Sequence, residues 1–155
     1  MAKPNTDVRG KNHGRRALKL APVRDAKAMI ASMSPTLGNG VFVFCRTADR
    51  AIADACFEQA IGFFAEAEGS SFILPIAAAE RLGVDHSIPM RLITLTVHSA
   101  LDGVGLTSAV AGTLANLQIP CNIVAAFHHD HVFVPYEQAD QALAALVELQ
   151  QHEGS

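Results

Sequence analysis

Four histidines and one aspartate in the second half of the chain have side chains that could carry chemistry. They are His98, which ends an alternating apolar run, and the neighbouring residues His128, His129, Asp130 and His131. Imidazole with carboxylate is a plausible ligand set for zinc or iron. Consecutive residues of a strand point to opposite faces, so at most His98 and one or two of the others can converge. A polar hairpin in which Asp130 caps the turn and His131 bonds a neighbour is therefore favoured. A metal site of His98, His129, Asp130 and His131 stays the alternative.

Nothing in the sequence assembles a nucleophile with a base and an orienting acid. Ser99 directly follows His98, and on a strand this sends the two side chains apart. The pair Gly103 and Gly105 lacks the third glycine and the downstream acid of a dinucleotide fingerprint. We therefore expect no catalysis and no cofactor. The alternatives are a metal-dependent enzyme that activates water with the histidines, and a structural subunit with a degenerate site.

The loop from Ser99 to Gly105 connects a predicted strand to a predicted helix. With a right-handed crossover, this loop and the hairpin from His128 to His131 lie at one edge of the sheet. The free N–H groups and the positive dipole end of the helix favour a carboxylate there. Gly103 would let the backbone approach such a ligand, and Asp102 could accept from an amine. The glycines could equally be needed only for positive φ.

The spacing of apolar residues predicts the elements that hold this loop. The second half of the chain has the order strand, helix, strand, strand, helix. These elements are Arg91–His98, Leu106–Leu117, Cys121–Phe127, His131–Val134 and Tyr136–Gln150.

The first half of the chain gives a weaker pattern. Asp25 is suited to cap a helix that Ser34-Pro35 ends, and Gly38-Asn39-Gly40 predicts a turn before a strand. The further predicted segments are a helix Asp25–Met33, strands Val41–Cys45, Ala60–Ala65 and Ser71–Leu74, a helix Ile76–Leu82 and a linker Asp85–Pro89. Ile52 to Phe64 could equally be helical.

Two compound motifs carry a resemblance to a known family. The run from Val97 to Thr107 has the pattern VHSxLxxVGLT, and the run from His129 to Pro135 has the pattern HDHxFVP. Together with the Cys121-Asn122 pair, they resemble a bacterial family of proteins with two ACT-like lobes. The resemblance implies an α+β, ferredoxin-like βαββαβ fold in each lobe, with antiparallel sheets and helices on one face. It also implies a non-catalytic role, in which an amino acid or similar metabolite is bound to regulate another process.

The loop and the resemblance together predict the ligand-binding residues. They are His98, Ser99, Asp102, Gly103, Val104, Gly105, Leu106, Thr107, Asn122 and Ile123. Asn122 lies at the opposite edge of its own lobe but could face the loop of a neighbouring lobe, where ACT pairs characteristically place the ligand. Bonding to local backbone is the alternative role of Asn122.

The resemblance also suggests how the chain is divided. We expect a flexible basic tail over residues 1–16, a first lobe over residues 17–88 and a second lobe over residues 90–150. The chain ends soon after its last predicted helix, so the second lobe lacks a final strand. We predict that Ala17 to Ala21 supplies this strand and interleaves the two lobes.

Composition limits the partners and the compartment. Half of the residues are hydrophobic and 17% are charged, so the chain should fold. A net charge of −3 with scattered acids and bases favours neither nucleic acid nor a membrane surface. No apolar run approaches the roughly 18 residues of a membrane-spanning helix. Cys45, Cys56 and Cys121 form no CxxC pair and indicate reduced packing residues, so a cytoplasmic location is expected.

The predicted strands have apolar residues on both faces, although helices in this fold cover only one. Val124, Ala126, Phe133 and Val134 are examples. We therefore expect a second subunit or the other lobe to cover the remaining face, and a homodimer is predicted.

Overall fold

The computed structural model describes residues 25–97 and 103–154. Its elements, in chain order, are α1 (Ala26–Ser32), β1 (Ser34–Thr47), α2 (Arg50–Phe57), β2 (Gly62–Glu66), β3 (Gly69–Pro75), α3 (Ile76–Leu82), β4 (Met90–Thr96), α4 (Leu106–Asn116), β5 (Asn122–Ala125), β6 (Asp130–Pro135), the short 3₁₀-helix η1 (Tyr136–Gln138) and α5 (Ala139–Glu153). The six strands form one antiparallel sheet in the order β2-β3-β1-β4-β6-β5. Among the described residues, no helix is long and apolar enough to cross a membrane.

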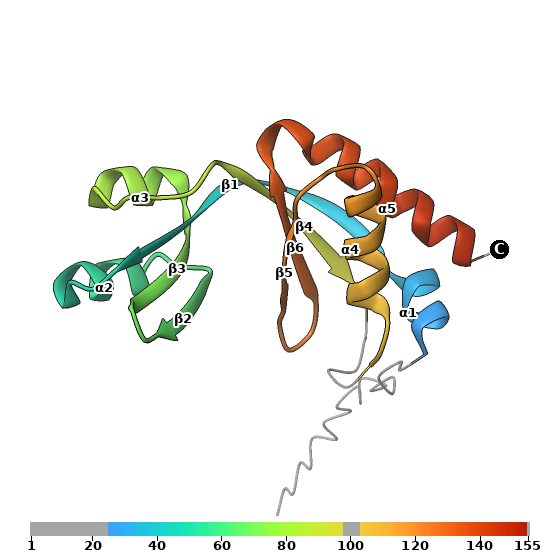
Figure 1. Cartoon of the computed structure of the whole chain (residues 1–155), viewed down its shortest axis with the longest axis horizontal. Helices are drawn as coiled ribbons and strands as arrows, with labels where there is room; N and C mark the ends of the chain where they lie inside the picture. Colours follow the sequence, from blue (N-terminus) through green and yellow to red (C-terminus); the bar gives the residue numbers. More distant parts are fainter. Residues whose placement is uncertain (1–24, 98–102, 155) are drawn as a thin grey trace, which may run out of the picture.

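The long strand β1 belongs to both lobes of the molecule (Figure 1). Its first part, Ser34 to Leu37, pairs with β4 in the second lobe, which also contains β5, β6, α4 and α5. Its last part, Phe42 to Thr47, pairs with β3 in the first lobe, beside β2, α2 and α3. The strand order β1-β4-β6-β5 completes the four-stranded sheet of a βαββαβ unit in the second lobe. The α+β ferredoxin-like class predicted from the sequence is confirmed.

The start of β1 takes the place of the final strand in the second lobe. Of the two edges of β4, one is paired with β6 and the other with Ser34 to Leu37. The segment Ala17 to Ala21, which the sequence predicts for this strand, lies outside the described residues. The lobes do interleave, and the strand they share is β1.

The glycine segment between the two parts of β1 does not form the predicted turn. The register passes from Leu37 opposite Ile93 to Val41 opposite Arg91, so β1 holds two extra residues within a continuous strand. A Cβ atom on Gly40 would lie 2.6 Å from the ring of Phe42, which explains a glycine at this irregularity. The Arg91 guanidinium donates to the Gly38 carbonyl at 2.8 Å and so ties the irregular part of β1 to β4.

All the helices cover the same face of the sheet. The core of the second lobe joins Leu37 and Ile93 to buried residues of α1, α4 and α5. The core of the first lobe joins Val43 and Cys45 of β1 to α2 and α3. Leu37, Val43 and Cys45 lie on one side of β1, because the two extra residues preserve the alternation of faces. The prediction of helices on one face is therefore confirmed.

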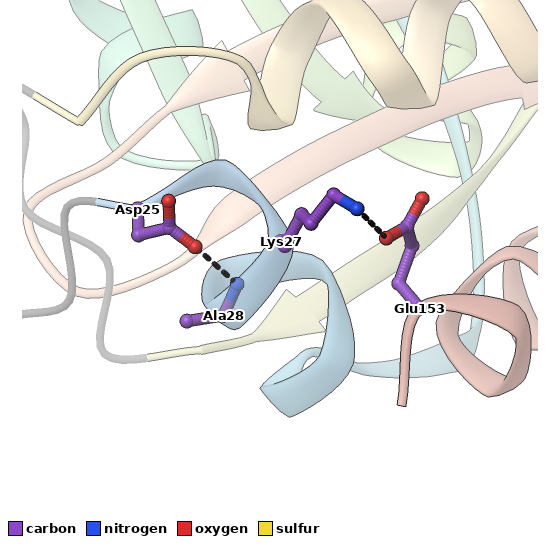
Figure 2. Close-up of polar contacts among 4 residues, drawn as sticks. All are labelled: Asp25, Lys27, Ala28 and Glu153. Carbon is purple, nitrogen blue, oxygen red and sulfur yellow. Dashed lines mark hydrogen bonds and ion pairs between the residues drawn. The ribbon is translucent and has the colours of Figure 1, made fainter. Parts of the chain in front are cut away.

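Helix α1 begins where the sequence predicts and is tied to the C-terminal helix (Figure 2). The Asp25 carboxylate accepts from the Ala28 N–H at 2.9 Å, which caps the helix. Lys27 Nζ lies 4.0 Å from a Glu153 carboxylate oxygen on α5. The Gln150 side chain, also on α5, donates to the Ala31 carbonyl at 3.0 Å. Helix α1 is thus part of the second lobe, next to α5.

The sheet face without helices is apolar, as the sequence indicates. Phe133 is buried there, and its ring meets those of Phe42 and Phe44 edge to face, with centroids 6.1 and 5.3 Å away. Ile73 and Met90 are buried in the same cluster. We call this surface the helix-free face.

The cysteines are free thiols. Cys45 and Cys56 are buried, and Cys121 is half-buried, so the predicted packing role fits the first two best. Burial, followed by the neighbouring Cys56, raises the pKa of Cys45 to about 11. Thiols in such surroundings stay protonated and unreactive.

Candidate functional site

Gly105, the last residue of the glycine loop, lies close to α1. Gly105 precedes α4 with φ +108°, and a Cβ atom added to it would lie 2.7 Å from the Ala26 Cβ of α1. Both facts require glycine, so the structural reason for this residue holds whether or not a ligand binds. Leu106 is buried, whereas Val104 is 80% exposed. Three predicted site residues, His98, Ser99 and Asp102, lie outside the described residues.

The start of α4 has no side-chain cap. The Ala109 N–H donates to the Gly105 carbonyl at 2.9 Å, and the preceding N–H groups of the first turn receive no side-chain acceptor from the N-cap residue. Thr107, in that first turn, is exposed. Free N–H groups at a helix start attract anions. The binding of a carboxylate at this end of α4 stays a prediction.

The histidine hairpin lies at the same edge of the sheet as the end of β4. Leu95 is opposite Asp130 and Thr94 is opposite His131. His131 Nδ1 is hydrogen-bonded to Thr94 Oγ1 at 3.2 Å, so the prediction that His131 bonds a neighbour is confirmed. Burial lowers the pKa of His131, and burial also raises the pKa of the Asp130 carboxyl against the opposing charges of its histidine neighbours. Burial therefore shifts the pKa of each group in the direction that favours its neutral form.

The described residues give no support to a metal centre at this hairpin. Among residues 25–97 and 103–154, no three histidine, cysteine, aspartate or glutamate side chains are placed to hold a metal ion. Asp130 and His131 alternate across β6, so their side chains leave opposite faces of the sheet. His98, the remaining member of the alternative ligand set, lies outside the described residues.

Asn122 and Ile123 lie on the outer strand β5, at the other end of the sheet from the glycine loop. Strands β4 and β5 are both antiparallel to β6, so the start of β5 lies near the start of β4. The Asn122 side chain is exposed, with its Nδ2 3.9 Å from Met90 Sδ. Ile123 packs against the core of the second lobe. Within one chain, Asn122 therefore lies far from the glycine loop. The sequence predicts this separation for a single lobe.

A cleft on the first lobe was missed by the sequence reasoning. It lies at the helix-free face and has a volume of about 360 Å³. Its lining residues are Phe44, Cys45, Arg46, Phe64, Ser71, Phe72, Ile73, Asp85 and His86. The alternation of Phe42, Phe44 and Arg46 on one side of β1 is a signal that could have shown this surface. The other wall comes from the segment Asp85–Pro89, which the sequence predicts as a linker. In the structure, His86 of this segment forms a β-bridge to Cys45.

Comparisons with known proteins define the class. Residues 21–91 and residues 87–148 each match the model of the ACT domain family, so the chain belongs to that family and carries two ACT domains in tandem. The two matches overlap at the start of β4, where the lobes meet. No curated protein matches the chain.

Several solved structures are similar to this chain. A Vibrio cholerae protein of unknown function is 42% identical, and the match covers 81% of this chain and 95% of that one with a TM-score of 0.72. An Agrobacterium tumefaciens protein is 19% identical over 76% and 89% of the two chains, with a TM-score of 0.61. The regulatory subunit of aspartate kinase from Thermus thermophilus is 12% identical over 74% and 95%, with a TM-score of 0.52. The last two share the fold.

Proposed function

We propose that this protein is a non-catalytic regulator that binds an amino acid and passes the occupancy of its site to a partner. The observation that carries the proposal is the pair of ACT domains built on one shared strand. ACT domains are regulatory ligand-binding modules, and the Thermus thermophilus protein with this fold is described as a regulatory subunit. Because β1 runs through both lobes, a shift at one end of this strand can bias the other lobe.

The ligand site that we propose combines two surfaces of the second lobe. The loop residues Gly103 and Val104 and the first turn of α4 offer N–H groups to the carboxylate of the ligand. Asn122 and Ile123 would come from a second copy of the chain, because they lie at the opposite end of their own sheet. A homodimer is therefore part of this proposal. The exposed outer strand β5 is a surface that such a dimer could use.

Thermal unfolding against the twenty amino acids tests the proposal. A ligand at about 100 times its Kd should add roughly 2.7 kcal/mol to the free energy of unfolding. We expect one or a few amino acids to raise the melting temperature of the full chain. Asn122→Ala should remove this shift, whereas Asn116→Ala, at the exposed end of α4, is the matched control and should retain it.

Two outcomes would contradict this function. No shift with any amino acid, together with a large shift with zinc or iron, would favour the histidine hairpin and a metal-dependent activity. No shift with either class would favour a structural subunit.

A further inference from the structure

The cleft on the first lobe is formed by segments that are distant in the sequence. Strands β1, β2 and β3 supply most of it, and the segment before β4 closes one side. The antiparallel bridge between Cys45 and His86 sets that side in place, and it is reinforced by the Ser87 N–H donating to the Phe44 carbonyl at 2.8 Å. In return, the Phe44 N–H donates to Ser87 Oγ at 2.9 Å. The cleft therefore has a rigid backbone frame.

The floor of the cleft is apolar and aromatic. Phe44 is fixed by its edge-to-face contact with Phe133, and Ile73 beside it is buried. Phe64 of β2 lies on the same face, opposite Ser71, and leaves 52% of its surface exposed. A volume of about 360 Å³ lies within the range of small-molecule sites, which are mostly apolar with a few polar groups for orientation.

The rim of the cleft carries one cation and one anion, Arg46 and Asp85. The bridge between Cys45 and His86 puts Arg46 opposite Asp85, with both side chains on the helix-free face. Neither forms an ion pair with any residue in the described part of the chain, where the ion pairs found join Lys27 to Glu153 and His152 to Glu148.

The other polar groups at the rim already have hydrogen bonds. His86 Nδ1 donates to the Ser87 carbonyl at 2.8 Å. Ser71 Oγ donates to the carboxylate of Glu66, which lies on β2 near the rim. Arg46 and Asp85 are therefore the charges that a bound molecule can engage.

We propose that this cleft binds an α-amino acid with an apolar side chain. The guanidinium of Arg46 receives the carboxylate, and the carboxylate of Asp85 receives the ammonium group. The side chain of the ligand lies on Phe44, Phe64 and Ile73. This inference rests on the proposed function and deepens it, because it names the ligand class and a site on the first lobe that is separate from the glycine loop of the second.

Isothermal titration with L-phenylalanine and two analogues tests each charge. 3-Phenylpropionate lacks the ammonium group, and phenethylamine lacks the carboxylate. Each should bind the full chain roughly 10-fold or more weakly than phenylalanine, because one charge-assisted hydrogen bond to a rim residue is lost. L-Leucine should also bind, and L-serine should not.

Two substitutions assign these differences to the cleft. Arg46→Gln should make phenylalanine and phenethylamine bind equally, and Asp85→Asn should make phenylalanine and 3-phenylpropionate bind equally. Arg50→Gln and Asp54→Asn, the same changes on exposed residues of α2 outside the cleft, should leave all affinities unchanged. If Arg46→Gln does not fold, Arg46→Lys keeps the charge without the bidentate geometry and should weaken only the carboxylate ligands.

The outcomes separate this site from the proposed function. Amino-acid binding that is identical in the wild type, Arg46→Gln and Asp85→Asn overturns the cleft and leaves the proposed function standing. Binding of no amino acid to the wild type overturns both. Sedimentation of Phe64→Ser completes the test: a dimer that dissociates while amino-acid affinity is unchanged shows that a second copy covers this face, and it overturns the cleft.

Discussion

The two lobes share a strand and a fold, but they differ in how much of their surface is buried. In the described residues, the core cluster of the second lobe contains fifteen buried residues, and that of the first lobe contains six. Between the start of α2 and the middle of β2, the first lobe leaves five large apolar residues exposed: Ile52, Phe57, Ile61, Phe63 and Phe64. Apolar burial is the main source of stability, so we expect the second lobe to contribute more of the free energy of unfolding than the first.

Truncation in the larger core should have the largest effect. Leu146 of α5 is fully buried, and Leu146→Ala should cost about 3 kcal/mol of the free energy of unfolding through lost burial and a cavity. Urea unfolding, followed by far-UV circular dichroism, measures this loss. Because β1 links the lobes, both should unfold in one transition; two separated transitions would contradict the coupling. Leu117→Ala, at an exposed position, should cost less than about 1 kcal/mol.

Replacing two glycines of the second lobe by alanine should change the stability of the chain in opposite directions. Gly105→Ala should destabilise the chain by about 1 to 3 kcal/mol, because φ is +108° and the new Cβ meets Ala26. Gly112→Ala, inside α4 and facing open space, should stabilise it by about 0.5 to 1 kcal/mol. Thermal unfolding of both variants checks the difference. A neutral Gly105→Ala variant that lost only ligand binding would show that the loop is not constrained by α1.

The attachment of α1 to the second lobe should depend on its cap more than on its ion pair (Figure 2). Asp25→Ala removes the acceptor of the Ala28 N–H and should cost about 1 kcal/mol. Lys27→Ala should change stability by less than can be measured, because the lysine side chain is 83% exposed and surface ion pairs contribute little. Chemical denaturation compares the two. An equal loss in both variants would contradict this ranking.

The hairpin should give the second lobe a small dependence on pH. Burial lowers the pKa of His131, so the folded state binds its proton less readily than the unfolded state does. Its stability contribution is present above the ordinary histidine pKa of about 6.5 and is lost as pH falls below that value. The stability advantage of the wild type over His131→Gln should therefore shrink from pH 7 to pH 5. Urea unfolding of both proteins at the two pH values measures this change, and an advantage that stays constant would contradict it.

The sequence predicted the second lobe better than the first because its patterns are local. The alternation around Ile93 and Leu95 identifies β4, and the helical spacing after Gly105 identifies α4. Asp25 is the predicted cap, and Gly83 ends α3 in the left-handed conformation. In the first lobe, the ambiguous stretch from Ile52 to Phe64 divides into the end of α2 and the start of β2. Short apolar segments do not distinguish these two structures by period alone.

The candidate sites also differ in how far local patterns predict them. The common edge of β4 and the histidine hairpin follows from chain order and crossover handedness, and the sequence predicted it. Arg46 and Asp85 are far apart in the chain, so no local pattern indicates that they meet at the rim of one cleft. Gly38-Asn39-Gly40 has the composition of a turn. The residues before it pair with β4 and the residues after it pair with β3, and this pairing keeps β1 continuous.

By itself, the sequence determined the strands and helices of the second lobe and the apolar character of both sheet faces, because these properties depend on residues close in the chain. The two compound motifs added the resemblance to ACT-like units. Only the tertiary structure decided which strand completes the second lobe, where the helix-free face opens into a cleft, and which charges remain without a partner. Those outcomes depend on the competition of distant segments for the same sheet edge, and that competition leaves no periodic pattern in the sequence.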